Sequence, residues 1–205
     1  MKYIIAMLLS VTTANAELID INVVKNWNSN GVAVGHEATV DNKTLHLVGS
    51  GTAVQKVGNQ RIPLFVVQIY AEIPMFFVRN EQMAIESASD VGLIGIRITS
   101  LRWYQPSILW DAINKSSRNP NAVVYQAARA SISGAYIAPG ETVNIVGSGG
   151  LTLVENAAGI VTSIREPNAI QHILSLFIGD VKGFTSLDLK EQLLQHPAFT
   201  YGDKQ

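Results

Sequence analysis

The stretch that decides the fold is residues 49–72, GSGTAVQKVGNQRIPLFVVQIYAE. Its small residues predict a turn at 49–51, in which the glycines supply positive φ angles. Residues 53–57 and 61–72 are predicted strands, joined by a tight turn at Gly58 and Asn59. Side chains alternate along a strand, so the odd-numbered positions of the second strand share one face and the even-numbered positions share the other. Both faces are mostly apolar, which predicts a central strand of an antiparallel sheet with layers above and below it.

The rest of the chain supplies elements to surround this hairpin. A reverse turn is predicted at 40–44, and apolar residues at helical spacing predict helices, the first of which Asn80 should cap and the fourth of which Pro167 should open. These elements predict one domain at 17–205 with an α+β fold, an open-faced sandwich in which an antiparallel sheet carries a layer of helices on one face. The other predicted strands are 18–24, 32–37, 44–48, 93–101, 142–146, 151–155 and 159–164, and the predicted helices are 80–88, 106–114, 123–132, 167–178 and 187–195.

The amino-acid composition limits the classes of function that the chain can have. The 205 residues are 47% hydrophobic and 15% charged, which is enough to bury a sizeable core in one domain. A net charge of -1 gives no electrostatic reason to expect nucleic acid as a partner. The chain has no cysteine, which excludes disulfides and thiolate catalysis, and its four histidines lack the spacing of a metal site. We therefore predict no metal and no cofactor.

The N-terminus has the pattern of an export signal. Lys2 supplies a positive charge, residues 4–9 form a short apolar run, and Ala14-Asn15-Ala16 provides the small residues that a signal peptidase accepts. The apolar run is too short to span a bilayer. The sequence predicts a signal peptide at 1–16, cleaved after Ala16, and a periplasmic or secreted mature chain without a membrane span.

The order of elements resembles the chalcone isomerase-like family from about Leu45 to Leu194. The resemblance rests on the Gly-x-Gly step at 49–51, the hairpin, the strand that closes on Ile69-Tyr70-Ala71-Glu72, and the ending at 176–180 before a terminal helix. It implies the same fold, which plant isomerases share with bacterial exported members and with plant members that bind fatty acids.

The resemblance also implies where a site would lie. The plant enzymes cyclise a chalcone with the help of an Arg, whose position falls on Ala53, and a Thr, whose position falls on Phe65. Their Lys and Tyr positions fall near Thr99 and Ile108. Without a guanidinium at position 53 the developing oxyanion has no charge partner, so the isomerase activity is not carried over. Arg61 would inherit the role if the hairpin register were slipped.

Two groups of residues are candidates for binding a ligand. Ala53, Phe65, Val67 and Ile108 either line an apolar cleft between sheet and helices or are simply core. The candidates for a substitute polar anchor are Arg97, Thr99 and Tyr104, although Arg97 is also explained as an ion-paired or solvated edge residue.

Three hypotheses for the function follow. The first, which we favour, is an exported, non-catalytic chalcone isomerase-like protein that binds a small hydrophobic molecule such as a fatty acid. The second is an intramolecular lyase of the isomerase type, whose donors have moved to Arg97, Thr99 and Tyr104. The third is a ligand-free interaction module of the cell envelope, with protein partners that the sequence does not name.

Overall fold

The computed structural model describes residues 17–22, 27–105, 122–132, 134, 136–179 and 187–195. Within these ranges an antiparallel sheet runs in the order β1-β4-β5-β6-β7-β8-β9-β10, and β2 pairs with β3 in a separate hairpin. The strands are β1 (Asp20–Asn22), β2 (Trp27–Ser29), β3 (Val32–Val34), β4 (Glu37–Val40), β5 (Lys43–Val57), β6 (Gln60–Ala71), β7 (Ile94–Ser100), β8 (Thr142–Ser148), β9 (Leu151–Glu155) and β10 (Val161–Arg165).

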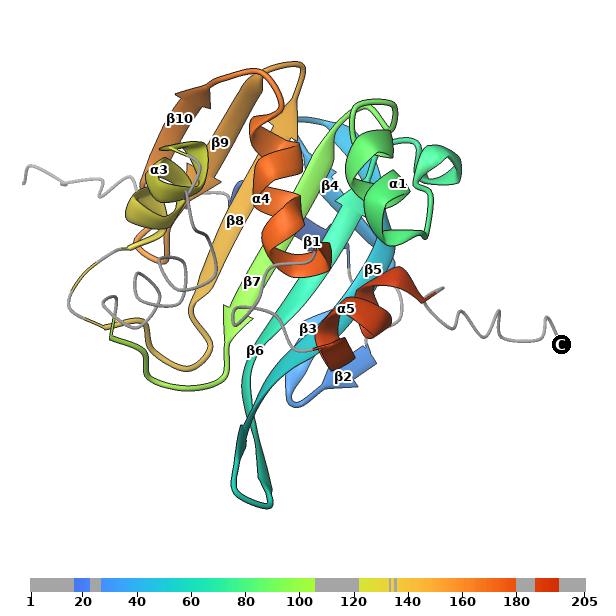
Figure 1. The fold of residues 1–205 in the computed structure, drawn as a ribbon. Coiled ribbons are helices and arrows are strands. Elements are labelled where there is room, and N and C mark those ends of the chain that lie inside the picture. The colour runs from blue at the N-terminus through green and yellow to red at the C-terminus, as the bar shows by residue number, and fades with distance from the viewer. Residues whose placement is uncertain are drawn as a thin grey trace, which may run out of the picture.

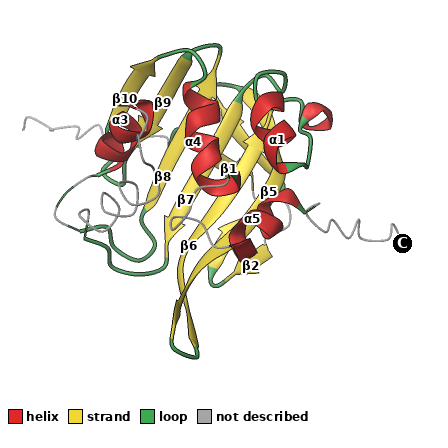
Figure 2. Ribbon diagram, viewed as in Figure 1, coloured by secondary structure: helices red, strands yellow, loops and turns green. Residues whose placement is uncertain are grey.

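The helices lie together on one face of this sheet (Figures 1 and 2). Helix α4 (Ala169–Ile178) packs on β8 and β9, α5 (Leu187–Leu194) packs on β5 and β6, and α3 (Ala122–Ser131) packs on β9 and β10. Helix α1 (Glu81–Ser87) contacts α4, and it follows the short 3-10 helix η1 (Pro74–Phe76). The predicted antiparallel sheet with a helical layer on one face is confirmed.

The sheet also has a covered second face. Its N-terminal edge curls, so that β1 and β4 fold behind β6 and β7 (Figure 1). Val67 and Ile69 of β6 belong to the large core under the helices, whereas Tyr70 belongs to a smaller core formed with the N-terminal strands. The alternation predicted for this strand is therefore confirmed, and each face of β6 meets a different layer.

The prediction of a turn at 49–51 is wrong. Gly49 and Gly51 lie inside β5, which runs without interruption through the strands predicted at 44–48 and 53–57, with bulges between Leu47 and Gly49 and between Ala53 and Val54. Neither glycine has a positive φ. These two positions require glycine because α5 packs directly on them. A Cβ on Gly51 would stand 2.9 Å from Leu189 Cδ1.

Other boundaries also shift. The strand predicted at 32–37 is broken at Gly35, where a Cβ would stand 2.2 Å from Ile21 Cγ2. Asn80 precedes α1 with extended backbone angles, but its side chain makes no capping hydrogen bond. Helix α4 begins at Ala169 rather than at Pro167. The helix predicted at 106–114 lies outside the described residues.

The predicted turns at the hairpins are confirmed. Asp41 and Asn42 adopt positive φ angles of 47° and 63° between β4 and β5, and Gly58 does so with a φ of 59° between β5 and β6. Asp and Asn tolerate this region better than most residues, and glycine enters it freely. These turns fix the register that places the candidate site residues.

Candidate functional site

Three of the predicted apolar site residues lie together on the helix-bearing face of the sheet. Ala53 of β5 is the register partner of Phe65 of β6, and Val67 pairs with Gly51 two residues along. Ala53 and Val67 are buried, while Phe65 is half-buried and packs against the core under the helices. The structure therefore brings these three together, as predicted. Ile108 lies outside the described residues.

Tyr104 joins this group from the end of β7. Its backbone pairs with Ile137 in an isolated bridge, and its ring centroid lies 6.5 Å from that of Phe65, with the rings tilted by 59°. Among the described residues, the buried Tyr104 hydroxyl has no hydrogen-bond partner. Burial raises the pKa of this hydroxyl above its ordinary value of 10.0, against a smaller opposing effect of Arg102. The hydroxyl is therefore a neutral, unused donor and acceptor beside an aromatic ring.

Burial falls along this face toward the Phe65 end. Ile69 of β6 and Ile96 of β7 are fully buried under the helices. Phe65 and Ile98, on the same two strands and the same face, are only half-buried. The apolar surface beside Tyr104 is thus less completely covered than the centre of the sheet.

Arg97 and Thr99 lie on the opposite face of the sheet. Arg97 pairs in register with Gln68 and Thr99 pairs with Val66, so both follow the even positions of β6, away from Phe65. The structure does not bring them together with Tyr104 and Phe65. The physical reason is the strand alternation, which points Ile96 and Ile98 toward the helices and sends Arg97 and Thr99 to the other side.

On that opposite face, Arg97 is ion-paired rather than free. Its side chain is 14% exposed, and Nη1 contacts the Glu17 carboxylate and donates to the Ile19 carbonyl oxygen at 3.1 Å. The ion-paired interpretation of Arg97 therefore fits, although β7 is a central strand and not an edge. Arg97 and Thr99 help to line an open pocket of about 370 Å³, and the buried Thr99 hydroxyl has no hydrogen-bond partner within the described ranges. The other lining residues are Glu17, Asp20, Ile21, Gly31, Val32, Ala33, Gly140 and Thr142.

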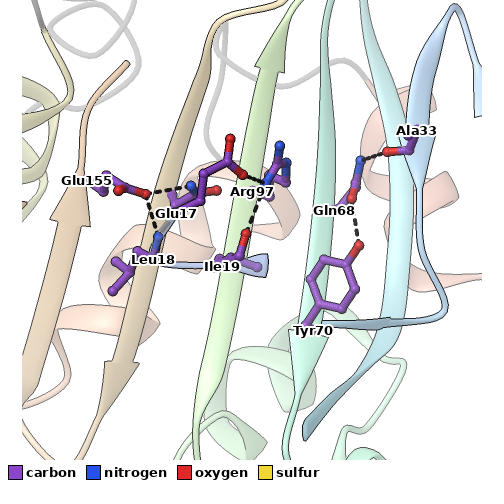
Figure 3. A network of polar contacts seen from close by, with 9 residues as sticks. Glu17, Leu18, Ile19, Ala33, Gln68, Tyr70, Arg97 and Glu155 are labelled. Carbon is purple, nitrogen blue, oxygen red and sulfur yellow. Dashed lines mark hydrogen bonds and ion pairs between the residues drawn. The ribbon is translucent and has the colours of Figure 1, made fainter. Parts of the chain in front are cut away.

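A row of polar side chains crosses this face next to the pocket. Gln68, Arg97, Asn144 and Glu155 are register partners on the neighbouring strands β6, β7, β8 and β9. All but Arg97 are buried. Figure 3 shows the row meeting residues 17–19 of the N-terminal segment and Ala33. We call these four residues the polar row. Of these four, only Arg97 is predicted from the sequence as a site residue, although polar residues inside otherwise apolar strands were a signal for the other three.

The alternative anchor, Arg61, has another role. The hairpin register pairs Arg61 with Lys56, and its guanidinium forms an ion pair with Asp188 of α5. Arg61 is exposed, and it holds α5 against the hairpin.

Neither a metal site nor a membrane helix is found in the part of the chain that the structure describes. No group of three or more His, Asp or Glu side chains there is arranged to hold a metal ion. No helix in the same ranges is long and apolar enough to cross a bilayer.

Comparison with known proteins identifies the fold. No family model matches the sequence, and no curated protein matches it. Among solved structures, the fatty-acid binding protein AtFAP1 of Arabidopsis thaliana is similar, with a TM-score of 0.60 and 13% sequence identity over 83% of this chain and 96% of that chain. With its curled antiparallel sheet and its helices on one face, the chain has the chalcone isomerase-like fold.

Proposed function

We propose that this protein is an exported, non-catalytic binding protein for a small hydrophobic molecule with a polar head group, such as a fatty acid. The apolar part lies against Phe65 and Ile98 on the helix-bearing face, and the head group bonds to Tyr104. The observation that carries this proposal is the buried Tyr104 hydroxyl, which lacks a hydrogen-bond partner among the described residues and lies beside a half-buried apolar surface.

The energetics of the unpaired hydroxyl favour a ligand at this place. A buried polar group without a hydrogen bond costs about 1–3 kcal/mol, and an oxygen of a bound carboxylate would accept its proton and remove that cost. The adjoining face supplies the apolar contact that an acyl chain needs. One polar group beside a largely apolar surface is the usual composition of a small-molecule site.

The separation of the candidate donors supports a binding role rather than the isomerase alternative. Stabilising an oxyanion requires several donors that converge on one point. Tyr104 contacts Phe65 on the helix-bearing face, whereas Arg97 and Thr99 face the other side of the sheet. Tyr104 therefore has neither of the two partners that the relocated-donor hypothesis assigned to it.

Two further observations support the proposal. The similar structure AtFAP1 is described as a fatty-acid binding protein. The apolar run at 4–9 and the small residues at 14–16 support export and removal of residues 1–16.

The first test is native mass spectrometry of the mature protein purified from the periplasm of a Gram-negative host, followed by organic extraction. We expect a stoichiometric hydrophobic molecule. A clean ligand-free mass, unchanged after incubation with a mixture of fatty acids, would refute the binding role and leave the interaction module.

Variants then locate the site in a titration with oleate. Tyr104→Phe should weaken binding about tenfold, which corresponds to about 1.4 kcal/mol. Tyr136→Phe is the matched control, because Tyr136 is 52% exposed and close in sequence to Ile137, the bridge partner of Tyr104. Thr99→Val should leave the affinity unchanged, since Thr99 lies on the other face. A loss of binding in Thr99→Val with none in Tyr104→Phe would move the site to the helix-free face.

A further inference from the structure

Glu155 is a buried carboxylate that only neutral groups hold. It lies in β9, is 5% exposed, and its Oε2 accepts hydrogen bonds from the Leu18 backbone N–H at 2.8 Å and from Asn144 Nδ2 at 2.7 Å. Within the described ranges it has no ion-pair partner. A buried carboxylate is almost always paired with a cation, because taking its charge out of water is costly.

The segment at 17–19 is held firmly across the polar row beside this carboxylate. Ile19 is fully buried, and it packs so closely over β7 that a Cβ on Gly95 would stand 3.2 Å from Ile19 Cδ1. The Arg97 guanidinium contacts both the Glu17 carboxylate and the Ile19 carbonyl oxygen, as Figure 3 shows. Glu17 is therefore fixed on one side by its own side chain and on the other by the Leu18 bond to Glu155.

This arrangement places the backbone nitrogen of Glu17 within reach of Glu155. Consecutive backbone nitrogens are at most about 3.6 Å apart, and the Leu18 nitrogen already bonds to the carboxylate. If the chain starts at Glu17, rotation about its Cα–C bond turns the ammonium group toward the carboxylate without moving Leu18, and the Glu17 side chain readjusts its own torsions to keep its contact with Arg97.

We propose that the polar row is a binding site for the chain's own mature N-terminus, in which Glu155 pairs with the α-ammonium group of Glu17 while Arg97 holds the Glu17 side chain. The inference rests on the proposed export, because cleavage after Ala16 creates this ammonium group. The bond that breaks is the Ala16–Glu17 peptide bond, hydrolysed by a signal peptidase with water as the co-reactant. Before cleavage the Glu17 nitrogen is a neutral amide and Glu155 lacks its cation.

The pairing also makes the stability of the folded chain depend on removal of the signal sequence. The precursor folds with an uncompensated buried charge, so it is less stable than the mature chain. A less stable precursor suits transport across a membrane in an unfolded state, and removal of the signal then completes the fold.

The test compares chains with different N-termini, released in vitro from a fusion protein so that the result does not depend on export. One chain starts at Glu17, the second carries an additional Gly-Ser before Glu17, and the third starts at Glu17 with an acetylated amino group. We expect the extended and acetylated chains to melt lower than the free chain by about 4 °C or more. Equal melting temperatures of the three chains would overturn the inference.

Glu155→Gln separates the ion pair from other effects of the N-terminus. The amide retains an acceptor for Leu18 but carries no charge, so the difference between the free and the extended chain should vanish in this variant. Glu72→Gln is the control, because the Glu72 carboxylate also accepts a backbone N–H, from Leu93 at 3.0 Å, but lies outside the polar row. The difference should persist in Glu72→Gln, and its persistence in Glu155→Gln would contradict the pairing.

N-terminal sequencing of the protein recovered from the periplasm tests the cleavage itself. We expect it to begin at Glu17, and a different first residue would overturn the processing step. Neither the melting temperatures nor the N-terminal sequence depends on a lipid ligand. A failure of the N-terminal pairing can therefore be distinguished from a failure of the binding function.

Discussion

A methyl group on Gly49 of β5 would stand 2.3 Å from the backbone oxygen of Leu193 in α5. The helix and the strand touch through their backbones at this point. Gly49→Ala should therefore displace α5 and destabilise the protein by about 1–3 kcal/mol, the usual cost of overpacking. Urea denaturation monitored by circular dichroism measures the change.

Gly134→Ala is the matched control, because no described residue lies within 4 Å of a Cβ at Gly134 and its φ is not positive. This variant should leave the midpoint of urea denaturation equal to that of the wild type within experimental error. An unchanged midpoint in Gly49→Ala would mean that the close approach of α5 is not maintained in solution.

The two tyrosines with buried hydroxyls, Tyr70 and Tyr104, should respond in opposite ways to loss of those hydroxyls. Tyr70 donates to Gln68 Oε1 at 2.6 Å, so Tyr70→Phe leaves a buried acceptor unpaired and should cost about 1–2 kcal/mol. The Tyr104 hydroxyl has no hydrogen-bond partner in the described part of the chain, so Tyr104→Phe should leave the ligand-free protein equally or more stable. Burial raises the pKa of both hydroxyls, so both are neutral near pH 7. Thermal unfolding of the two delipidated variants measures these changes in stability. A similar loss of stability in both would contradict the unpaired state of the Tyr104 hydroxyl.

Arg79 connects the end of α5 to β5. Its Nη1 donates to the carbonyl oxygens of Val48 and of Gln195, the latter at 2.8 Å, and its guanidinium carbon lies 5.9 Å from the Phe77 ring centroid. Arg79→Met should destabilise the protein by about 1–3 kcal/mol, because both carbonyls lose a charged donor.

Hydrogen exchange should localise the effect of Arg79→Met to α5, whose amides should lose protection first. Arg165→Met, at an exposed position of β10, is the control and should leave the exchange of α5 unchanged. Uniform loss of protection over the sheet would argue against a local clamp.

Glu72 makes the protein sensitive to acid. The hydrogen bond from the Lys43 side chain, at 3.0 Å, holds the pKa of this carboxyl below its ordinary value of 4.5, with a smaller opposing effect of burial. Because the folded pKa is the lower one, the contribution of Glu72 to stability is fully present above pH 4.5 and is lost as the pH falls through the folded pKa.

The free energy of unfolding of the wild type should therefore exceed that of Glu72→Gln near neutral pH, and the two values should converge in acid. Lys43→Met should reproduce this behaviour. Urea titrations at a series of pH values measure the difference, and a gap that stays constant into acid would exclude the ionised pair as its cause.

Much of the fold could be predicted from local patterns. The hairpin turns at Asp41-Asn42 and Gly58, the alternation along β6 and the helical spacing of α4 depend on neighbours in the sequence, and the structure confirms them. The site was predicted only in part. Ala53, Phe65 and Val67 were correctly grouped, because alternation places residues of paired strands on one face.

The polar candidates Arg97, Thr99 and Tyr104 were grouped without knowing which face of the sheet each of them occupies. Alternation puts Arg97 and Thr99 on the same face of β7, but it does not say which face the helices cover. That choice depends on the register across β6, β7 and β8 and on where α4 and α5 pack. Arg97 and Thr99 were therefore predicted to lie beside Tyr104, from which the sheet separates them.

The sequence by itself determined most of the strands, the turns at Asp41-Asn42 and Gly58 and the α+β class, because a period of two, a period near 3.6 and residues that favour positive φ act over a few positions. Three points were decided only by the tertiary structure: why residues 49 and 51 must be glycine, on which face of the sheet Arg97 lies, and which groups contact Glu155. The contacts that settle these points join distant parts of the chain, such as Leu18 with Glu155 across 137 positions and Thr52 with Gln192 across 140. No local pattern encodes such pairs, because they form only when the sheet curls and the helices dock.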